Sequence, residues 1–153
     1  MNIVKKIDQF QDEFVYLFEP IPNNIVPNGK FIRILYSSPH VCLTGIYLFI
    51  SLQNIIVEPY FNKYKCSFVP FLHKKLIQDI FTIEESLLKK VNLPNKTPLF
   101  KITEQFKKGN IKLFSDCVPA GSFILKISGI WETDFFYGAT FKFLSVINPS
   151  VVK

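Results

Sequence analysis

The chain contains Ser122-Phe-Ile-Leu-Lys-Ile-Ser-Gly-Ile-Trp131 and, after five intervening residues, Tyr137-Gly-Ala-Thr-Phe-Lys-Phe-Leu-Ser-Val-Ile147. In each segment every second residue is apolar or small, which is typical of a β-strand with one buried face. The residues between them, Glu132 to Phe136, have the length of a hairpin loop. The sequence therefore predicts a β-hairpin, and the rest of the fold is interpreted around it.

The register of this hairpin follows from the length of its loop. With a five-residue loop, Lys126 lies directly opposite Lys142, and Ser128 lies opposite Thr140. Like charges directly across a ladder are destabilising, so a folded domain that keeps them has a use for the positive charge, and an anion is the obvious partner. The alternative is that two solvated lysines are simply tolerated, because exposed charges are well screened.

The two faces of the hairpin differ in chemistry. The expected core face is apolar and carries Phe123, Leu125, Ile127, Gly129 and Trp131 with Tyr137, Ala139, Phe141 and Phe143. The second face mixes cations, hydroxyls and aliphatic groups, and carries Ile124, Lys126, Ser128 and Ile130 with Gly138, Thr140, Lys142 and Leu144. Surfaces that bind single-stranded nucleic acids combine lysines with rings for base stacking. The second face supplies the lysines and no ring.

The rings are expected at the tip of the hairpin, from Trp131, Phe135, Phe136 and Tyr137, or elsewhere in the chain, from Tyr36, Tyr47, Tyr60 and Tyr64. An apolar cluster in a loop stays exposed unless something covers it. A nucleobase or a second subunit would cover it. The alternative is that these rings fold back into the core of the domain.

Short strands and proline-marked turns precede and follow one helical region. Strands are expected at Lys30–Tyr36, Cys42–Gln53, Ile55–Tyr60, Lys65–Leu72 and Ile111–Phe114. Residues 1–20 are expected to be helical and extended, and a helical insertion is expected over about 73–108. The fold class is therefore mainly β with a helical insertion (α+β). Its expected architecture is a single OB-like domain over 1–153, a small β-barrel with a helix between strands 3 and 4.

The charge of the chain is concentrated in its middle. The net charge is +6, with seventeen lysines and one arginine. The high content of lysine, asparagine and phenylalanine is typical of a gene rich in AT codons. The distribution of charge along the chain is therefore more informative than the net charge. Residues 59–112 contain eleven lysines and four acids, and the candidate phosphate contacts there are Lys63, Lys65, Lys107 and Lys108. A basic region attracts phosphate backbones whatever their base sequence. The alternative is that these lysines simply form the solvated surface of a helix.

Cysteine usage and the N-terminus indicate an intracellular protein, with nucleus and cytoplasm not distinguished. Cys42, Cys66 and Cys117 are odd in number and widely spaced, which favours buried thiols over disulfides. Met1 to Phe10 lacks the apolar core of a signal peptide. The uncharged run Val41–Val57 approaches the length of a membrane span, but its β-branched residues favour buried strands, so no membrane partner is expected.

No enzyme, metal site or cofactor is expected. The two histidines, His40 and His73, have no nucleophile or acid near them in a recognisable motif, and the six glycines form no phosphate-binding loop. Asp116, Glu132 and Asp134 are the only candidates for a two-metal nuclease site, and their spacing matches none.

The segment Leu125-Lys-Ile-Ser-Gly-Ile-Trp131, followed by Gly138-Ala-Thr-Phe-Lys-Phe143, resembles the closing hairpin of single-stranded DNA-binding proteins encoded by DNA viruses and phages. The match covers about twenty residues. It implies an OB fold and sequence-independent binding of single strands, and its carried-over residues are Lys126, Trp131, Phe141 and Lys142. Many such proteins end in an acidic tail that recruits polymerases, whereas this chain ends Pro149-Ser-Val-Val-Lys153, so that mode of recruitment is not expected.

The leading hypothesis is a single-stranded nucleic-acid-binding protein, with DNA favoured over RNA, that supports replication or recombination of a viral or mobile genome. Replication proteins and a second copy of the chain are further candidate partners. The alternative is a non-enzymatic structural or accessory subunit of a virus, in which Val41–Val57 and the aromatic tip form subunit interfaces.

Overall fold

The computed structural model describes residues 4–23, 29–114 and 119–145, apart from the side chain of Phe114. Its strands are β1 (Lys5–Lys6), β2 (Val15–Leu17), β3 (Ile21–Asn23), β4 (Gly29–Ser37), β5 (Cys42–Thr44), β6 (Ile46–Ser51), β7 (Ile56–Tyr60), β8 (Lys63–Ser67), β9 (Thr97–Leu99), β10 (Asn110–Phe114), β11 (Ser122–Glu132) and β12 (Phe136–Ser145). Its helices are α1 (Lys74–Val91) and α2 (Lys101–Lys108), with 3₁₀ turns η1 (Ile7–Gln9), η2 (Asp12–Phe14) and η3 (Pro70–His73).

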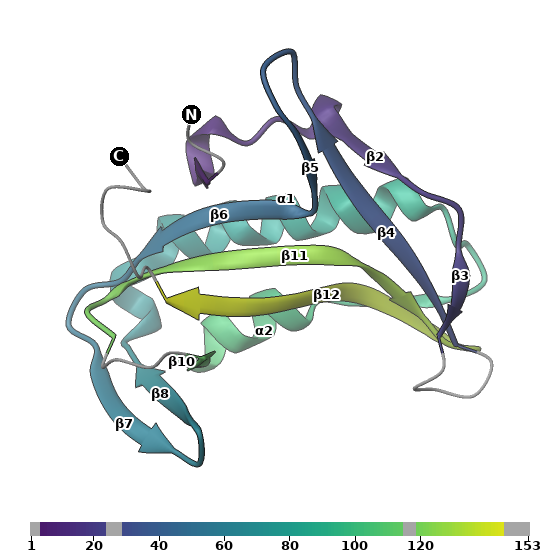
Figure 1. The fold of residues 1–153 in the computed structure, drawn as a ribbon. Helices are drawn as coiled ribbons and strands as arrows, with labels where there is room; N and C mark the ends of the chain where they lie inside the picture. The colour runs from purple at the N-terminus through teal and green to yellow at the C-terminus, as the bar shows by residue number, and fades with distance from the viewer. Residues whose placement is uncertain (1–3, 24–28, 115–118, 146–153) are drawn as a thin grey trace.

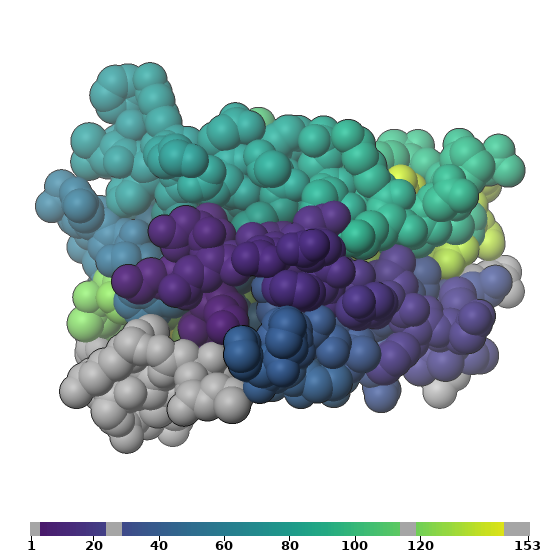
Figure 2. All heavy atoms as spheres, turned by 90° about the horizontal axis from the view of Figure 1, so that it is seen from above, coloured from purple at the N-terminus to yellow at the C-terminus, as the bar shows by residue number. Residues whose placement is uncertain are grey.

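The described residues form two layers, a curved mixed sheet and a pair of helices. Figure 1 shows α1 and α2 behind the long strands β6, β11 and β12. In Figure 2 the teal helical residues run along one side of the molecule, and the purple N-terminal residues lie between them and the blue strands β4 and β5. The rings of Phe106 on α2 and Phe143 on β12 meet at 5.7 Å between centroids, so the helices cover the predicted core face of the hairpin.

The first half of the hairpin register is confirmed. β11 and β12 are antiparallel, and Lys126 pairs with Lys142 as the loop length predicts. Phe123, Leu125 and Ile127 are almost completely buried, which places Lys126 on the opposite face of the strand. The second half differs, because a β-bulge interrupts the ladder between Ile127 and Gly129.

The bulge corrects three sequence-based expectations. Thr140 pairs with Gly129 rather than with Ser128. A one-residue shift exchanges the two faces of a strand, so Ile130 is fully buried whereas Trp131 is half-buried on the opposite face. β11 also extends to Glu132, and Glu132 pairs with Tyr137, so the connecting loop is shorter than expected.

The bulge coincides with a change of neighbour for β11. Up to Ile127 the strand pairs with β6, and from Gly129 onward it pairs with β4. Gly45 separates β5 from β6 at the same point, with φ of +108° and a position in which a Cβ would lie 3.1 Å from the carbonyl oxygen of Ile127. The expected single strand Cys42–Gln53 is therefore two strands, and glycine is needed where they separate.

The sheet does not close among the described residues. Its main path runs β1-β6-β11-β12-β10-β8-β7, and the remaining strands attach to β4 and β12. The expectation of a mainly β fold with a helical insertion is confirmed, and η3, α1 and α2 lie between β8 and β10. The closed OB-like barrel is not confirmed, and eight strands rather than three precede α1. Several of these strands have only two or three residues, too few for a period-two pattern to reveal.

A buried carboxylate joins the two helices. Glu84 of α1 is fully buried and accepts hydrogen bonds from the backbone N–H of Ile102 (3.1 Å) and Thr103 (2.9 Å) and from the Thr103 hydroxyl (2.7 Å). It therefore caps the N-terminus of α2 from a neighbouring helix. Burial raises the pKa of the Glu84 carboxyl, and the hydrogen bonds from Thr103 and Ile102 oppose that rise.

His73 and the cysteines have structural environments. His73 is buried, and its ring contacts the carbonyl of Val69 through Nδ1 and the N–H of Gln53 through Nε2, both at 3.0 Å. Cys66 is buried as expected, but Cys42 is exposed, which corrects the expectation for that thiol. Cys117 lies outside the described residues.

The uncharged run Val41–Val57 forms β5, β6 and part of β7 rather than a helix. None of the helices in the described ranges combines the length and apolarity that crossing a bilayer requires.

Candidate nucleic-acid interface

The outer sheet face, defined here as the face of β4, β6, β11 and β12 turned away from α1 and α2, carries the lysine pair. Tyr47, Lys126 and Lys142 form one row across three adjacent strands. The Lys126 ammonium lies 5.5 Å from the centroid of the Tyr47 ring, and Lys142 is exposed. Among the described residues neither lysine forms an ion pair with a carboxylate, so both charges are available to an anion.

A second row on this face adds an arginine. Arg33 of β4 pairs with Gly129, which pairs in turn with Thr140. Arg33 is exposed and Thr140 is half-buried. The ring of Phe31 lies over Gly129, since a Cβ added there would be 2.6 Å from Cζ of that ring. Glycine at 129 therefore allows an aromatic ring to lie across the sheet.

A third row contains the only tryptophan of the chain. Trp131 pairs with Phe31 on one side and with Gly138 on the other. A Cβ added at Gly138 would lie 2.8 Å from Cζ2 of Trp131, so the indole covers that glycine. Trp131 and Phe31 are both half-buried, with their rings on the surface that also holds Arg33. The face therefore has planar groups beside its cations.

Three more apolar side chains extend this face along β2 and β3. Tyr16, Phe18 and Ile21 are 53%, 44% and 47% exposed. Ile21 pairs with Phe31, and the backbone N–H of Phe18 donates to the carbonyl of Arg33 at 2.9 Å. Since Val15 is buried and Leu17 packs against the core, strand alternation directs Tyr16 and Phe18 outward.

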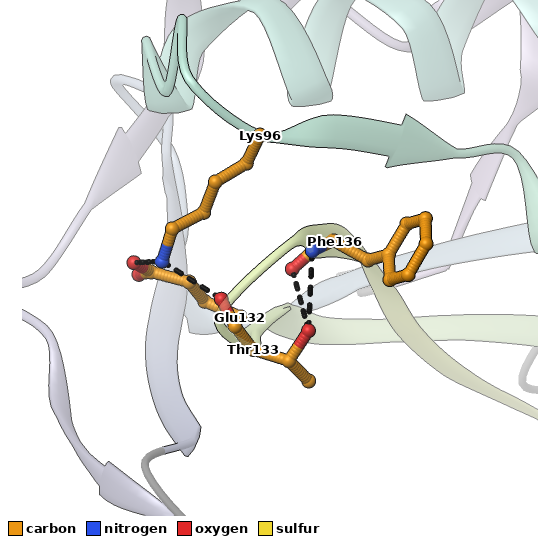
Figure 3. Close-up of polar contacts among 4 residues, drawn as sticks. All are labelled: Lys96, Glu132, Thr133 and Phe136. Atoms are coloured by element: carbon orange, nitrogen blue, oxygen red, sulfur yellow. Dashed lines mark hydrogen bonds and ion pairs between the residues drawn. The ribbon is translucent and has the colours of Figure 1, made fainter.

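The hairpin tip is held in place by an ion pair. Nζ of Lys96 lies 2.5 Å from Oε1 of Glu132 and donates to the carbonyl of Thr133 at 2.7 Å (Figure 3). The Thr133 hydroxyl also closes the turn, because it accepts from the N–H of Phe136 at 3.1 Å and donates to the Phe136 carbonyl at 3.3 Å (Figure 3). The backbone N–H of Thr133 donates to the same carbonyl at 2.8 Å. Glu132, a candidate metal ligand by sequence, is thus a structural partner of Lys96.

The rings of the tip separate into two groups. Phe135 is 73% exposed and Phe136 is 43% exposed, so both are accessible to a ligand as predicted. Tyr137 is only 8% exposed and belongs to β12. Its assignment as a stacking residue is wrong, because the strand begins one residue before it and alternation directs its ring into the core.

The remaining predicted lysines lie outside β4, β6, β11 and β12. Lys63 and Lys65 belong to β8 in the projecting β7–β8 hairpin (Figure 1). Lys65 pairs with Lys112 of β10, on the strand face opposite to the buried Ile111 and Leu113, so it lies on the same side of the sheet as Lys142. Lys107 and Lys108 are exposed in the last turn of α2, which covers the opposite face of the sheet. A single footprint that includes all the predicted lysines is therefore not formed, since the basic middle of the sequence folds into separate elements.

The structure adds Phe31, Arg33 and Phe18 to the candidate site, and of the four tyrosines considered as alternative sources of rings it places Tyr47 beside Lys126. The alternation in Lys30–Tyr36 already places Phe31 and Arg33 on one face of a strand, so that part of the signal was present in the sequence. Their proximity to Trp131 depends on β4 pairing with the second half of β11, which no local pattern indicates.

The described residues contain no group of histidine, cysteine, aspartate or glutamate side chains able to hold a metal ion. Asp116 lies outside the described residues. The outer sheet face thus offers cations, hydroxyls and rings, a set suited to binding an anionic, aromatic ligand. Comparisons of this chain with protein-family models, with curated proteins and with solved structures gave no match.

Proposed function

We propose that this protein binds single-stranded nucleic acid, DNA in preference, on its outer sheet face and without sequence choice. The observation that carries the proposal is the row Tyr47–Lys126–Lys142, two lysines without carboxylate partners held side by side across a sheet. Folding sets these like charges against each other at a cost, which a phosphate backbone would offset.

The neighbouring rows supply the second requirement, a surface for bases. Phe31 and Trp131 lie over glycine residues beside Arg33, and Phe18 extends the apolar surface. Base stacking on such rings contributes about 1–3 kcal/mol per base and tolerates any sequence. Paired bases of a duplex are not available for it, so single strands are the expected ligand.

The test is a titration with an oligo-dT of about 16 nucleotides, a length typical of small single-strand-binding domains. Trp131 is the only tryptophan of the chain, so its emission reports contact with this face directly. We expect quenching on binding. Three phosphate contacts, one each for Arg33, Lys126 and Lys142, would weaken affinity about twentyfold between about 50 mM and about 200 mM salt.

The control is a duplex of the same length, which should bind more weakly and quench less. Equal affinity at both salt concentrations would contradict the electrostatic part of the proposal. Binding without any change in Trp131 emission would contradict the assignment to this face.

A structural or accessory-subunit role is the second candidate, and exposed apolar side chains favour it. Tyr16, Phe18 and Ile21 are each more than two-fifths exposed and lie near one another on β2 and β3. Exposed apolar patches of this kind mark protein interfaces as well as ligand sites. Gel filtration with absorbance ratios separates the candidates, because a large assembly free of nucleic acid favours the subunit role.

A further inference from the structure

A groove lies on the helical side of the molecule, where η3, the first turns of α1 and the end of α2 meet. It encloses about 500 Å³, and its apolar lining comes from Pro70, Phe71, Ile77 and Phe81. Lys74 and Gln78 of α1 and Lys107 of α2 complete the lining. We call this surface the helix-side groove, and it uses none of the residues of the outer sheet face.

Carboxylates of the two helices do not neutralise the lysines of the groove. Asp79 pairs with Lys75 at 2.6 Å, Glu85 with Lys89 at 3.6 Å and Glu104 with Lys101 at 3.8 Å. Glu84, the remaining acid of α1 and α2, is buried as the cap of α2. Within the described part of the chain Lys74 and Lys107 therefore have no carboxylate partner.

The apolar part of the groove is also left uncovered by the described residues. Phe71 is 70% exposed and its neighbour Leu72 is 53% exposed, both on the short turn η3. An aromatic ring exposed beside cations at a concave site is typical of an interaction surface, since aromatic side chains are enriched at the centres of protein interfaces.

The positions of the lysines favour a protein ligand over a nucleobase. The Lys74 ammonium lies 4.2 Å from the centroid of Phe71, and the Lys107 ammonium lies 6.0 Å from that of Phe81. A lysine already lies over one face of each of these rings, which leaves less ring surface on which a base could stack. A carboxylate can pair with the ammonium group while an apolar side chain fills the space between the rings.

We propose that the helix-side groove binds a short acidic segment of a partner protein that carries aromatic or aliphatic side chains among its carboxylates. Its aspartates or glutamates pair with Lys74 and Lys107, and its apolar side chain contacts Phe71 and Ile77. Because α1 and α2 cover the face of the sheet opposite to Lys126 and Lys142, such a partner and a single strand can be held together.

The test uses a fluorescein-labelled synthetic peptide in which leucine and phenylalanine alternate with aspartate and glutamate. We expect saturable binding in fluorescence anisotropy, and at least about a tenfold loss with Lys74→Glu combined with Lys107→Glu. We expect about a fivefold loss with Phe71→Ser. A peptide with serine in place of leucine and phenylalanine should bind much more weakly.

Two matched controls identify the site. Lys89→Glu combined with Lys101→Glu makes the same charge change, one substitution on each of the same helices, outside the groove lining. Leu72→Ser removes an exposed apolar side chain next to Phe71 that does not line the groove. Both should keep the affinity for the peptide within about twofold, as surface changes away from a contact do.

Several results would overturn the proposal. One is absence of peptide binding by the wild-type protein at about 1 mM peptide, the weakest affinity of interest. Another is an equal loss in the control variants. A third is a loss of affinity for oligo-dT, or for vesicles of anionic phospholipid, in the groove variants as large as the loss for peptide. The peptide measurements involve none of the residues of the outer sheet face, so their failure is distinguishable from failure of the nucleic-acid proposal.

Discussion

The outer sheet face and the helix-side groove use the same two kinds of side chain in different shapes. On the sheet, Lys126 and Lys142 stand in a row across adjacent strands, and Trp131 and Phe31 lie beside them over glycines. In the groove, Lys74 and Lys107 each face a ring across a concave space. A broad row of cations suits a linear polyanion, whereas a short concave site suits a few side chains of a peptide. Composition alone therefore does not assign a ligand, and geometry is needed.

The largest expected effect separates the two surfaces by charge reversal. Lys126→Glu with Lys142→Glu should weaken oligo-dT binding by roughly a hundredfold, because two phosphate contacts become repulsive. The slope of log affinity against log salt should also fall by about 1.4. Filter binding or Trp131 emission measures both. We expect the melting temperature to stay within a few degrees of wild type, because Lys142 is exposed, Lys126 is half-buried, and neither forms an ion pair with another described residue that the substitutions would break.

The groove variant Lys74→Glu with Lys107→Glu is the matched control for this experiment. Both double substitutions lower the net charge from +6 to +2, so a general loss of attraction would affect them equally. We expect oligo-dT affinity to fall only in the sheet variant and peptide affinity only in the groove variant. Equal losses of oligo-dT affinity would show that net charge, rather than the row on the sheet, governs binding.

The sequence predicted the part of the sheet site that depends on local pattern. Alternation and loop length were sufficient to pair Lys126 with Lys142 and to place both opposite the buried side chains of β11. They could not reveal the bulge at Ser128, because that bulge arises where β6 gives way to β4 as the neighbour of β11. The position of Trp131, and therefore its proposed use as a stacking surface, depends on this change of neighbouring strand.

The sequence did not predict the groove, again because the groove depends on contacts between residues that are distant in the chain. Its residues come from η3, α1 and α2, and their meeting depends on the cap that Glu84 provides across the two helices. In sequence, Glu84 and Glu85 look like a pair of surface charges. Only the fold distinguishes the buried Glu84 carboxylate from its half-buried neighbour Glu85. The expected barrel was not confirmed, and the sequence could not decide it, since closure depends on pairings between distant short strands.

The second prediction concerns the cap that Glu84 provides for α2. Of the two surfaces, only the helix-side groove should be affected. Glu84→Gln keeps the shape of the side chain but places an amide where two backbone N–H groups need acceptors, so it should lower the free energy of unfolding by about 1–3 kcal/mol. It should also weaken peptide binding several-fold through movement of α2, while oligo-dT binding stays unchanged. Urea denaturation and the two binding assays measure these effects.

The stability that the Glu84 cap contributes should also depend on pH. Burial raises the pKa of the Glu84 carboxyl above its unfolded value, so the folded protein holds that proton more tightly than the unfolded chain does. The stability that this group contributes is therefore complete below the unfolded pKa and declines as pH rises through the folded pKa. The difference in unfolding free energy between wild type and Glu84→Gln should shrink between mildly acidic and neutral pH. A difference that grows over that range would contradict this account of the site.

The smallest expected effect tests where the sheet surface ends. Phe135 is the most exposed ring of the hairpin tip, and its turn is fixed by Lys96, Glu132 and Thr133 rather than by Phe135 itself (Figure 3). Phe135→Ser should therefore change the free energy of unfolding by no more than about 0.5 kcal/mol. Oligo-dT affinity should fall about fivefold, the lower end of what one stacked base contributes.

Leu72→Ser is the matched control for this change, because Leu72 is also an exposed apolar side chain but belongs to η3 on the helical side. We expect it to leave oligo-dT affinity unaltered. A loss in Phe135→Ser larger than that of the Lys126 and Lys142 double variant would make the tip the main contact. The row across β6, β11 and β12 would then be a secondary one, since a surface governed by phosphate contacts cannot depend more on one ring than on two cations.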